Sequence, residues 1–195
     1  MNTNLRRTVL FVAVLNLGYF GVEFAVALSI RSVALFADSI DFLEDASINL
    51  LIAVALGWTA LAKSRLGMLL AGILLIPGLA TLWAAFGKFM APAPPAPLPM
   101  SLTGLGALAV NLSCAFMLAK FRKHDGSLTR AAFLSARNDA IANVAIISVG
   151  LATALTLSAW PDLIVGLAIA AMNADAAREV WKAAREERDT VRVSG

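Results

Sequence analysis

The sequence is poor in charge and in the side chains that crosslink chains or bind metals in clusters. Only 15% of its 195 residues are charged, and it has one cysteine and one histidine. The single cysteine, Cys114, excludes an intrachain disulfide. The single histidine, His124, stands alone in the basic stretch KFRKHDGS, where we expect it to be solvated rather than to bind metal. So little charge also excludes an ordinary soluble domain.

Hydrophobic residues, which make up 59% of the chain, instead indicate a membrane protein. A spanning helix needs about 20 mostly apolar residues, and short polar or proline-rich breaks separate six such stretches. No small-residue cleavage site follows the first stretch, so we expect an uncleaved span. We predict an all-α membrane protein with six transmembrane helices in a transport domain over 1–183, followed by a short charged cytoplasmic tail over 184–195. The predicted spans are approximately Thr8 to Ile30, Val33 to Ala62, Leu66 to Met90, Leu98 to Ala119, Leu128 to Leu157 and Pro161 to Trp181.

The basic residues predict the orientation of these spans. Of the 16 Lys and Arg residues, 13 fall on one side of the six-span arrangement, only Arg31 and Lys88 fall on the other, and Arg137 lies within the fifth span. By the positive-inside rule, both termini are cytoplasmic. The net charge of +3 therefore reflects topology, and no nucleic-acid partner is needed to explain it. We expect a multi-pass protein of the bacterial inner membrane.

A few ionisable residues lie inside the predicted spans. Each costs about 2.5–3.5 kcal/mol at mid-bilayer, so such groups usually face a polar interior and have a function. The first, second and fifth spans carry them: Glu23, Asp38, Asp41, Glu44, Asp45, Arg137 and Asp139.

The second and fifth spans share a D-A-x-x-N core. In DFLEDASINLLI and SARNDAIANVAI, Asp45 aligns with Asp139 and Asn49 with Asn143, while Asp41 aligns with Ser135. Residues four apart on an α-helix lie about 40° apart around its axis. Each span therefore presents one polar stripe, and facing stripes would bring three carboxylates and a hydroxyl to one point. We predict a cation site formed by Asp41, Asp45, Ser135 and Asp139.

The other ionisable or amide side chains have more than one interpretation. Asp38 either caps the second helix or lies at the mouth of the cation site. Glu44 points away from the polar stripe, and we expect it to pair with Arg137. Asn49 and Asn143 are either interhelical hydrogen-bonding groups or supports for the site. No role is assigned to Glu23 or Asn138.

Three segments together resemble the cation diffusion facilitator family of divalent metal/proton antiporters. They are NLGYFGVEFAVALSIRSVALFADSIDFLEDASINLL, SLTRAAFLSARNDAIANVAII and WPDLIVGLAIA, and the likeness covers nearly all of residues 8–183. The resemblance implies six helices, a homodimer, and export of zinc or a similar ion in exchange for protons. It also places the transport site on Asp41 and Asp45 of the second helix and on Ser135 and Asp139 of the fifth.

The sequence departs from the family pattern in two ways. The usual fifth-helix histidine is Ser135 here, so all the expected donors are oxygens, and only KAAREERDTVRVSG follows Trp181 where the family's cytoplasmic domain of about 80 residues is expected. Oxygen donors suit hard ions such as Mn²⁺, whereas Zn²⁺, Co²⁺ and Cd²⁺ gain more from nitrogen or sulfur. Because the family favours zinc, we rank Zn²⁺ first, then Mn²⁺, Co²⁺ or Cd²⁺. We expect no cofactor apart from the transported metal and protons.

Electrostatics suggests how such a site would work. Without metal, neighbouring carboxylates repel one another and retain at least one proton, and a divalent ion expels it. Rocking of helix groups around a midplane site would expose it to each side in turn, with Gly18, Gly21, Gly57 and Gly72 permitting close helix approach. A membrane metal sensor or accessory subunit without transport is the alternative function. We do not expect an enzyme. An intramembrane aspartyl protease would need a glycine-aspartate motif, and neither DFLEDASINLLI nor SARNDAIANVAI contains one.

Overall fold

The computed structural model describes residues 3–55, 78–121 and 127–193 of the chain. Helices account for nearly all of these residues, which confirms the prediction of an all-α fold. The labelled helices are α1 (Thr3–Ile30), α2 (Val33–Ala55), α4 (Pro97–Ala119), α5 (Ser127–Thr156) and α6 (Trp160–Val193), and residues 78–90 form a further helix.

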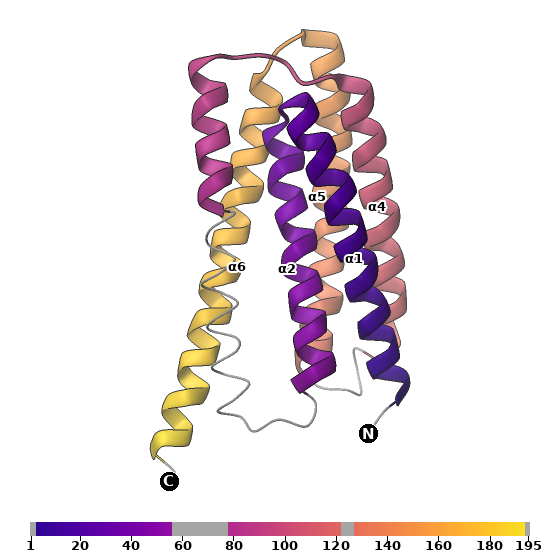
Figure 1. Ribbon diagram of the computed structural model, residues 1–195, viewed down its shortest axis with the longest axis vertical. Helices are drawn as coiled ribbons and strands as arrows, with labels where there is room; N and C mark the ends of the chain where they lie inside the picture. The colour runs from indigo at the N-terminus through magenta and orange to yellow at the C-terminus, as the bar shows by residue number, and fades with distance from the viewer. Residues whose placement is uncertain (1–2, 56–77, 122–126, 194–195) are drawn as a thin grey trace.

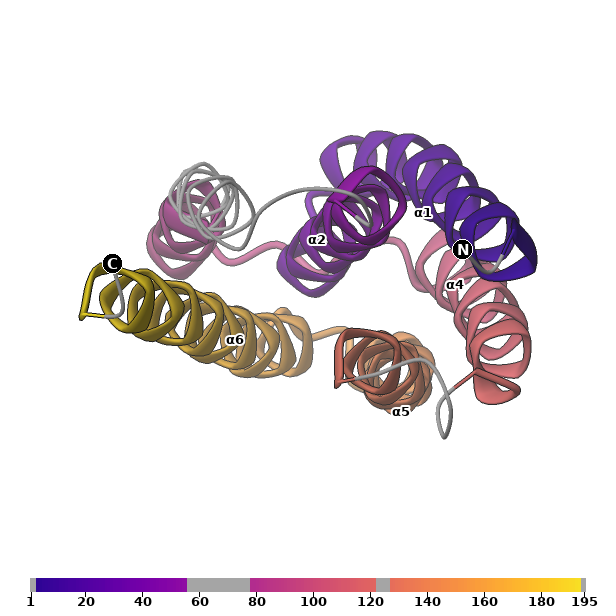
Figure 2. The same ribbon diagram turned by 90° about the horizontal axis from the view of Figure 1, so that it is seen from below.

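The helices run side by side along the long axis of the molecule (Figure 1). The start of α1 and the end of α6 lie at the same end of the bundle, as the predicted topology requires. In the view along the bundle, α1 lies beside α2, and α4 lies beside α5 (Figure 2). Helix α2 also packs against α5 and α6, so it has neighbours on several sides. Helix α2, which carries two of the four predicted site residues, is thus an interior helix.

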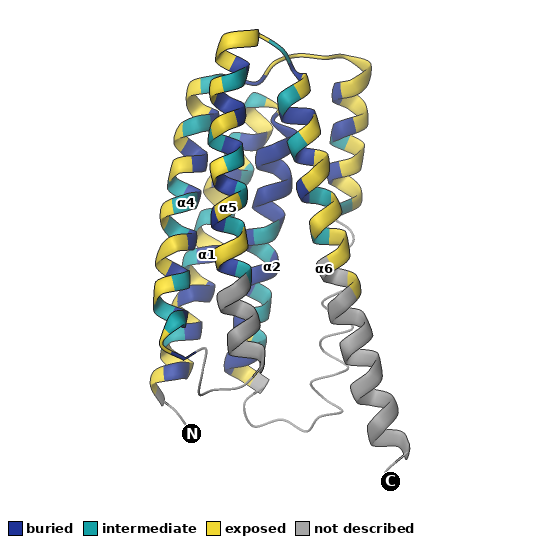
Figure 3. Ribbon diagram, turned by 180° about the vertical axis from the view of Figure 1, so that it is seen from behind, coloured by how far each residue is buried: buried dark blue, intermediate teal, exposed yellow. Residues whose placement is uncertain are grey.

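The burial pattern is that of a protein surrounded by lipid. Large apolar side chains on the outside of the bundle are exposed, such as Phe116 at 78% and Leu155 at 87%. By contrast, Asn16, Glu23 and Asp38 are each 0% exposed. Buried residues follow α2 along its length, while exposed residues line the outer faces of α4 and α5 (Figure 3). Soluble proteins rarely expose so much contiguous apolar surface, so this arrangement supports a membrane environment.

Three of the described helices are long and apolar enough to cross a membrane by length and composition: Asn4–Ile30, Pro97–Ala119 and Ser135–Thr156. Helix α2 carries four acids within Val33–Ala55, which explains why hydropathy alone does not select it. Helix α6 continues to Val193, so the segment predicted as a tail is helical up to that residue. The stretch in which His124 was expected to be solvated lies outside the described residues.

The sites of close helix approach differ from those predicted. Among the described residues, a Cβ atom built at Gly18 or Gly21 would meet nothing within 4 Å, so neither glycine marks a close helix approach there, contrary to the prediction. Gly57 and Gly72 lie outside the described residues. A Cβ at Gly166 would instead lie 2.7 Å from backbone atoms of Val33 and Ala34. The absence of a side chain at Gly166 is therefore what allows α6 to touch the start of α2.

A buried polar network joins this start of α2 to α6 and to the helix at 78–90. Asp162 is 0% exposed and accepts hydrogen bonds from the backbone N–H of Val33 at 2.9 Å and from the hydroxyl of Ser32 at 2.6 Å. The Lys88 ammonium forms an ion pair with Asp162 and also donates to the carbonyl of Arg31 at 2.8 Å. Because a carboxylate at a helix N-terminus satisfies free N–H groups, Asp162 fixes the first turn of α2.

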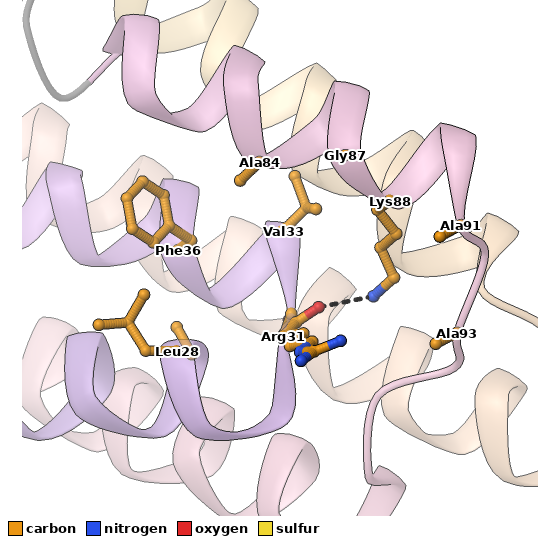
Figure 4. Close-up of a pocket in the computed structure, with 11 residues that line it drawn as sticks. Leu28, Arg31, Val33, Phe36, Ala84, Gly87, Lys88, Ala91 and Ala93 are labelled. Atoms are coloured by element: carbon orange, nitrogen blue, oxygen red, sulfur yellow. Dashed lines mark hydrogen bonds between the residues drawn. The ribbon is translucent and has the colours of Figure 1, made fainter.

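A cavity of about 360 Å³ opens beside this network, between the α1–α2 corner and the helix at 78–90. Its walls are mostly apolar, and the Lys88 side chain reaches across it to the Arg31 carbonyl (Figure 4). Of the α2 residues that line the cavity, Phe36 lies furthest along the helix. The cavity therefore ends before the acidic part of α2 begins.

Candidate metal site

The polar stripes of α2 and α5 face each other, as the repeated D-A-x-x-N core predicted. The Ser135 hydroxyl on α5 donates a hydrogen bond to Oδ1 of Asp45 on α2 at 2.9 Å. One helical turn further along α5, Asp139 is an electrostatic neighbour of Asp45 and of Asp41. Two turns further, the Asn143 amide donates to Oδ2 of Asp38 at 2.6 Å.

These contacts reveal an antiparallel register between the two stripes. Moving up α5 from Ser135 to Asn143 corresponds to moving back along α2 from Asp45 to Asp38. Ser135 therefore contacts Asp45, although the aligned sequences placed it opposite Asp41. Sequence alignment shows which residues are equivalent in a repeat, but the chain direction decides which of them meet.

The site residues lie at the border between the core and more accessible space. Asp45 is 5% exposed, while the side chains of Asp41, Ser135 and Asp139 are partly buried. Within the described ranges, no group of three His, Cys, Asp or Glu side chains is arranged closely enough to hold a metal ion directly. The predicted ligand set thus remains a prediction, of which the structure gives the Ser135–Asp45 contact and the electrostatic proximity of Asp41 and Asp139.

Glu44 does not pair with Arg137, contrary to the expectation from the sequence. Glu44 is buried on α2 and lies electrostatically close to Asp45. Arg137 is exposed and donates to the side-chain oxygen of its neighbour Asn138 at 3.1 Å. In the part of the chain described, Lys88–Asp162 is the only ion pair. The acids of α2 and α5 therefore have no basic side chain among the described residues to neutralise them.

Asp38 does not cap α2, which was one of its two interpretations. It lies more than a turn inside α2, whose first turn is capped by Ser32 and Asp162. The Asn143 amide that binds Asp38 accepts, through Oδ1, a hydrogen bond from Asn111 on α4 at 2.9 Å. An amide chain therefore connects α4, α5 and α2, and Asn143 has the interhelical role that was one of its two interpretations.

Sequence reasoning missed Asn111 because the residue has no charged neighbour and belongs to no repeat. Its position inside an apolar span was the available signal, since buried amides in membranes need partners. Asn49 differs from Asn143: its amide donates to the carbonyl of Asp45 within α2 at 2.8 Å. It thus braces the backbone at Asp45 and makes no interhelical bond through that group.

The comparison with known proteins agrees with the resemblance seen in the motifs. The family model for the cation efflux transmembrane domain matches residues 9–187. No curated protein gives a significant match. The family match covers most of the chain, including all four predicted site residues and every labelled helix in whole or in large part. The chain therefore belongs to the cation efflux, or cation diffusion facilitator, family, whose members transport divalent metal cations across membranes and are not enzymes.

Proposed function

We propose that this protein exports Zn²⁺ or a similar ion, such as Mn²⁺, Co²⁺ or Cd²⁺, from the cytoplasm in exchange for protons. We further propose that Asp41, Asp45, Ser135 and Asp139 bind the ion. The observation that carries this proposal is the Ser135–Asp45 hydrogen bond, because it brings the two D-A-x-x-N segments together at one level of the bundle. The family membership supplies the reaction class.

The chemistry of these side chains fits a transported rather than a permanently bound ion. Carboxylate and hydroxyl oxygens bind divalent cations, but zinc gains more from imidazole or thiolate ligands. The missing fifth-helix histidine therefore favours weaker binding. A site that must release its cargo on the far side benefits from such moderate affinity.

Two observations support proton exchange: the acidity of the proposed site and, among the described residues, the lack of basic groups that pair with its acids. Asp41 lies electrostatically close to Asp38, Glu44, Asp45 and Asp139. So many acids in a partly desolvated place cannot all be ionised without a counterion. Either protons or a metal ion can supply the positive charge, so binding of one displaces the other.

The same proposal includes the arrangement of the protein in its membrane. The positive-inside distribution favours both termini in the cytoplasm. The start of α1 and the end of α6 lie at the same end of the bundle (Figure 1), which agrees with this orientation. We propose the bacterial inner membrane and a homodimer, the latter on the strength of the family resemblance. Crosslinking in native membranes would measure the oligomeric state.

Flux in proteoliposomes tests the transport proposal. Purified protein is reconstituted with a zinc indicator and a pH-sensitive dye inside, and Zn²⁺ is added outside. We expect zinc entry, a simultaneous rise in internal pH, and faster entry when the interior is made more acidic. Liposomes without protein and liposomes with Asp45→Asn are the controls. Zinc entry without any change in internal pH would identify a uniporter, and zinc binding by calorimetry without entry would identify the sensor function.

A further inference from the structure

Two carboxyl groups deep in the bundle lack the hydrogen bonds that buried polar groups normally make. Glu23 on α1 is 0% exposed, and neither of its side-chain oxygens has a hydrogen-bond partner in the part of the chain that the structure describes. Asp38 on α2 is also 0% exposed, and its Oδ1 has no partner although its Oδ2 accepts from Asn143. Buried groups without partners are rare in proteins and call for an explanation.

The two unpartnered groups are each other's neighbours. Asp38 is the titratable group that acts most strongly on Glu23, and the two side chains lie within hydrogen-bonding reach of each other. An ionised carboxylate can only accept hydrogen bonds, so two ionised carboxylates cannot bond to each other. A single proton placed between them converts one into a donor and satisfies both groups.

The surroundings make two negative charges here unfavourable. The other titratable groups connected electrostatically to the pair are Asp41 on α2, which acts on Glu23, and Tyr19 on α1 and Asp139 on α5, on which the pair acts. Each of these is acidic, and among the described residues no Lys or Arg acts on Glu23 or Asp38. An unpaired buried charge costs several kcal/mol, and a second like charge beside it adds repulsion.

We propose that Glu23 and Asp38 form a proton-binding site, in which the protonated carboxyl group of Glu23 donates a hydrogen bond to the carboxylate of Asp38. This site joins α1 to α2, whereas the predicted metal site joins α2 to α5. Asn143 holds Asp38 in the orientation in which Oδ2 is occupied and Oδ1 is free to accept that bond.

The location of the pair gives the proton a role in exchange, a step that rests on the proposed function. Asp41 and Asp139 are two of the proposed metal ligands, and both are also electrostatic neighbours of the Glu23–Asp38 pair. A divalent ion bound there would add positive charge near Glu23 and favour its ionised form. The proton would then leave Glu23 for water, and it would return when the metal is released. Glu23 would thus contribute one of the protons exchanged for each ion.

Infrared spectroscopy of the purified, metal-free protein tests the protonation directly. We expect the carbonyl stretch of a protonated carboxylic acid in the wild type at neutral pH, and the loss of one component of it in Glu23→Gln. The matched control is Asp175→Asn, which removes an exposed acid on α6 and should leave the band unchanged. A spectrum that is the same in the wild type and in Glu23→Gln would overturn the proposal, because Glu23 would then be ionised or hydrated.

A second variant keeps the test decisive if Glu23→Gln does not fold. In Asp38→Asn the acceptor changes from a charged carboxylate to a neutral amide, so the Glu23 band should move to the frequency of a more weakly hydrogen-bonded acid. An unmoved band would show that Glu23 does not donate to Asp38.

Proton release on metal addition separates the role in exchange from the protonation itself. In weakly buffered detergent solution, Zn²⁺ binding by Glu23→Gln should release about one proton fewer per chain than the wild type. Equal proton release by both would refute the role in exchange, even if the infrared band is present. Absence of zinc flux in liposomes, with the infrared result intact, would instead count against the proposed function and leave the proton site standing.

Discussion

The hydroxyl of Ser135 donates to the carboxylate of Asp45 across the α2–α5 interface, at 2.9 Å. This bond occupies one carboxylate oxygen with a neutral donor, at the position where the family usually has an imidazole. The Ser135 hydroxyl can rotate its hydrogen away from Asp45. Its oxygen can then direct a lone pair toward a cation. The contact therefore joins α2 and α5 at the proposed metal site by a bond that needs no counterion.

The first prediction concerns the charged ligands. Asp45→Asn and Asp139→Asn should each reduce zinc flux by at least about 10- to 100-fold, by analogy with the losses seen when metal sites lose supporting groups. Each substitution keeps the size of the side chain and removes a charge from the acidic cluster. Flux in proteoliposomes at several zinc concentrations is the measurement.

Asp175→Asn is the control for this experiment, because Asp175 is an exposed acid on α6. It should transport like the wild type. Size-exclusion profiles of all three variants should match that of the wild type. Near-normal flux in both site variants would show that the ion passes elsewhere.

The second prediction concerns metal selectivity. Ser135→His should shift preference toward Zn²⁺ over Mn²⁺ by about 10- to 100-fold, since an added nitrogen donor benefits zinc more. Competition between the two ions in the flux assay measures the shift. Ser148→His is the matched control, because Ser148 lies on the same helix but is exposed and bonds to the Val144 carbonyl. An unchanged preference in Ser135→His would mean that residue 135 does not reach the ion.

The repeat in the sequence was sufficient to identify the two helices that face each other, but not their register. Apolar runs fix helix positions because backbone groups in lipid must be satisfied within the helix. The D-A-x-x-N cores fix which faces are polar. The pairing of Ser135 with Asp45 instead depends on the antiparallel packing of α2 against α5, which arises only in the folded bundle.

Contacts between helices were the least predictable part of the fold. Gly166 and Gly18 both lie within predicted apolar spans, yet of the two only Gly166 lies against the backbone of another described helix. Likewise Asp162, at the start of the sixth predicted span, gave no sign that it would cap a helix about 130 residues earlier. Such relationships depend on the three-dimensional arrangement of segments far apart in the chain.

The third prediction concerns the amide chain between α4 and α2. Asn111→Leu removes the donor to Asn143 and leaves a buried amide oxygen without a partner. Interhelical hydrogen bonds in membranes contribute about 0.6–2 kcal/mol, so the free energy of unfolding should fall by that amount. Unfolding in mixed detergent measures it, and Ser113→Ala, which affects an exposed bond within α4, should be nearly neutral. Equal stability of Asn111→Leu and the wild type would contradict this role.

The fourth prediction concerns the buried ion pair of Lys88 and Asp162. Removing either charge alone, by Lys88→Met or Asp162→Asn, should cost about 3–5 kcal/mol of unfolding free energy, because the remaining charge is left unpaired in the interior. The double variant should cost clearly less than the sum of the two, which is the signature of direct coupling. Additive losses would indicate that the two residues stabilise the bundle independently.

The fifth prediction compares two glycines that differ only in their surroundings. Gly166→Ala places a methyl group 2.7 Å from the backbone of Val33 and Ala34, so α6 must move away from the start of α2. Overpacking of this kind costs about 1–3 kcal/mol, and the movement would also pull Asp162 from the N–H groups that it caps.

Gly18→Ala is the control. Among the described residues its methyl group meets nothing within 4 Å, and the change gains helix propensity, which is worth up to about 1 kcal/mol. Thermal unfolding in one detergent should therefore give a lower midpoint for Gly166→Ala and an equal or higher one for Gly18→Ala. The reverse order would mean that α6 does not depend on contact at Gly166 for its position.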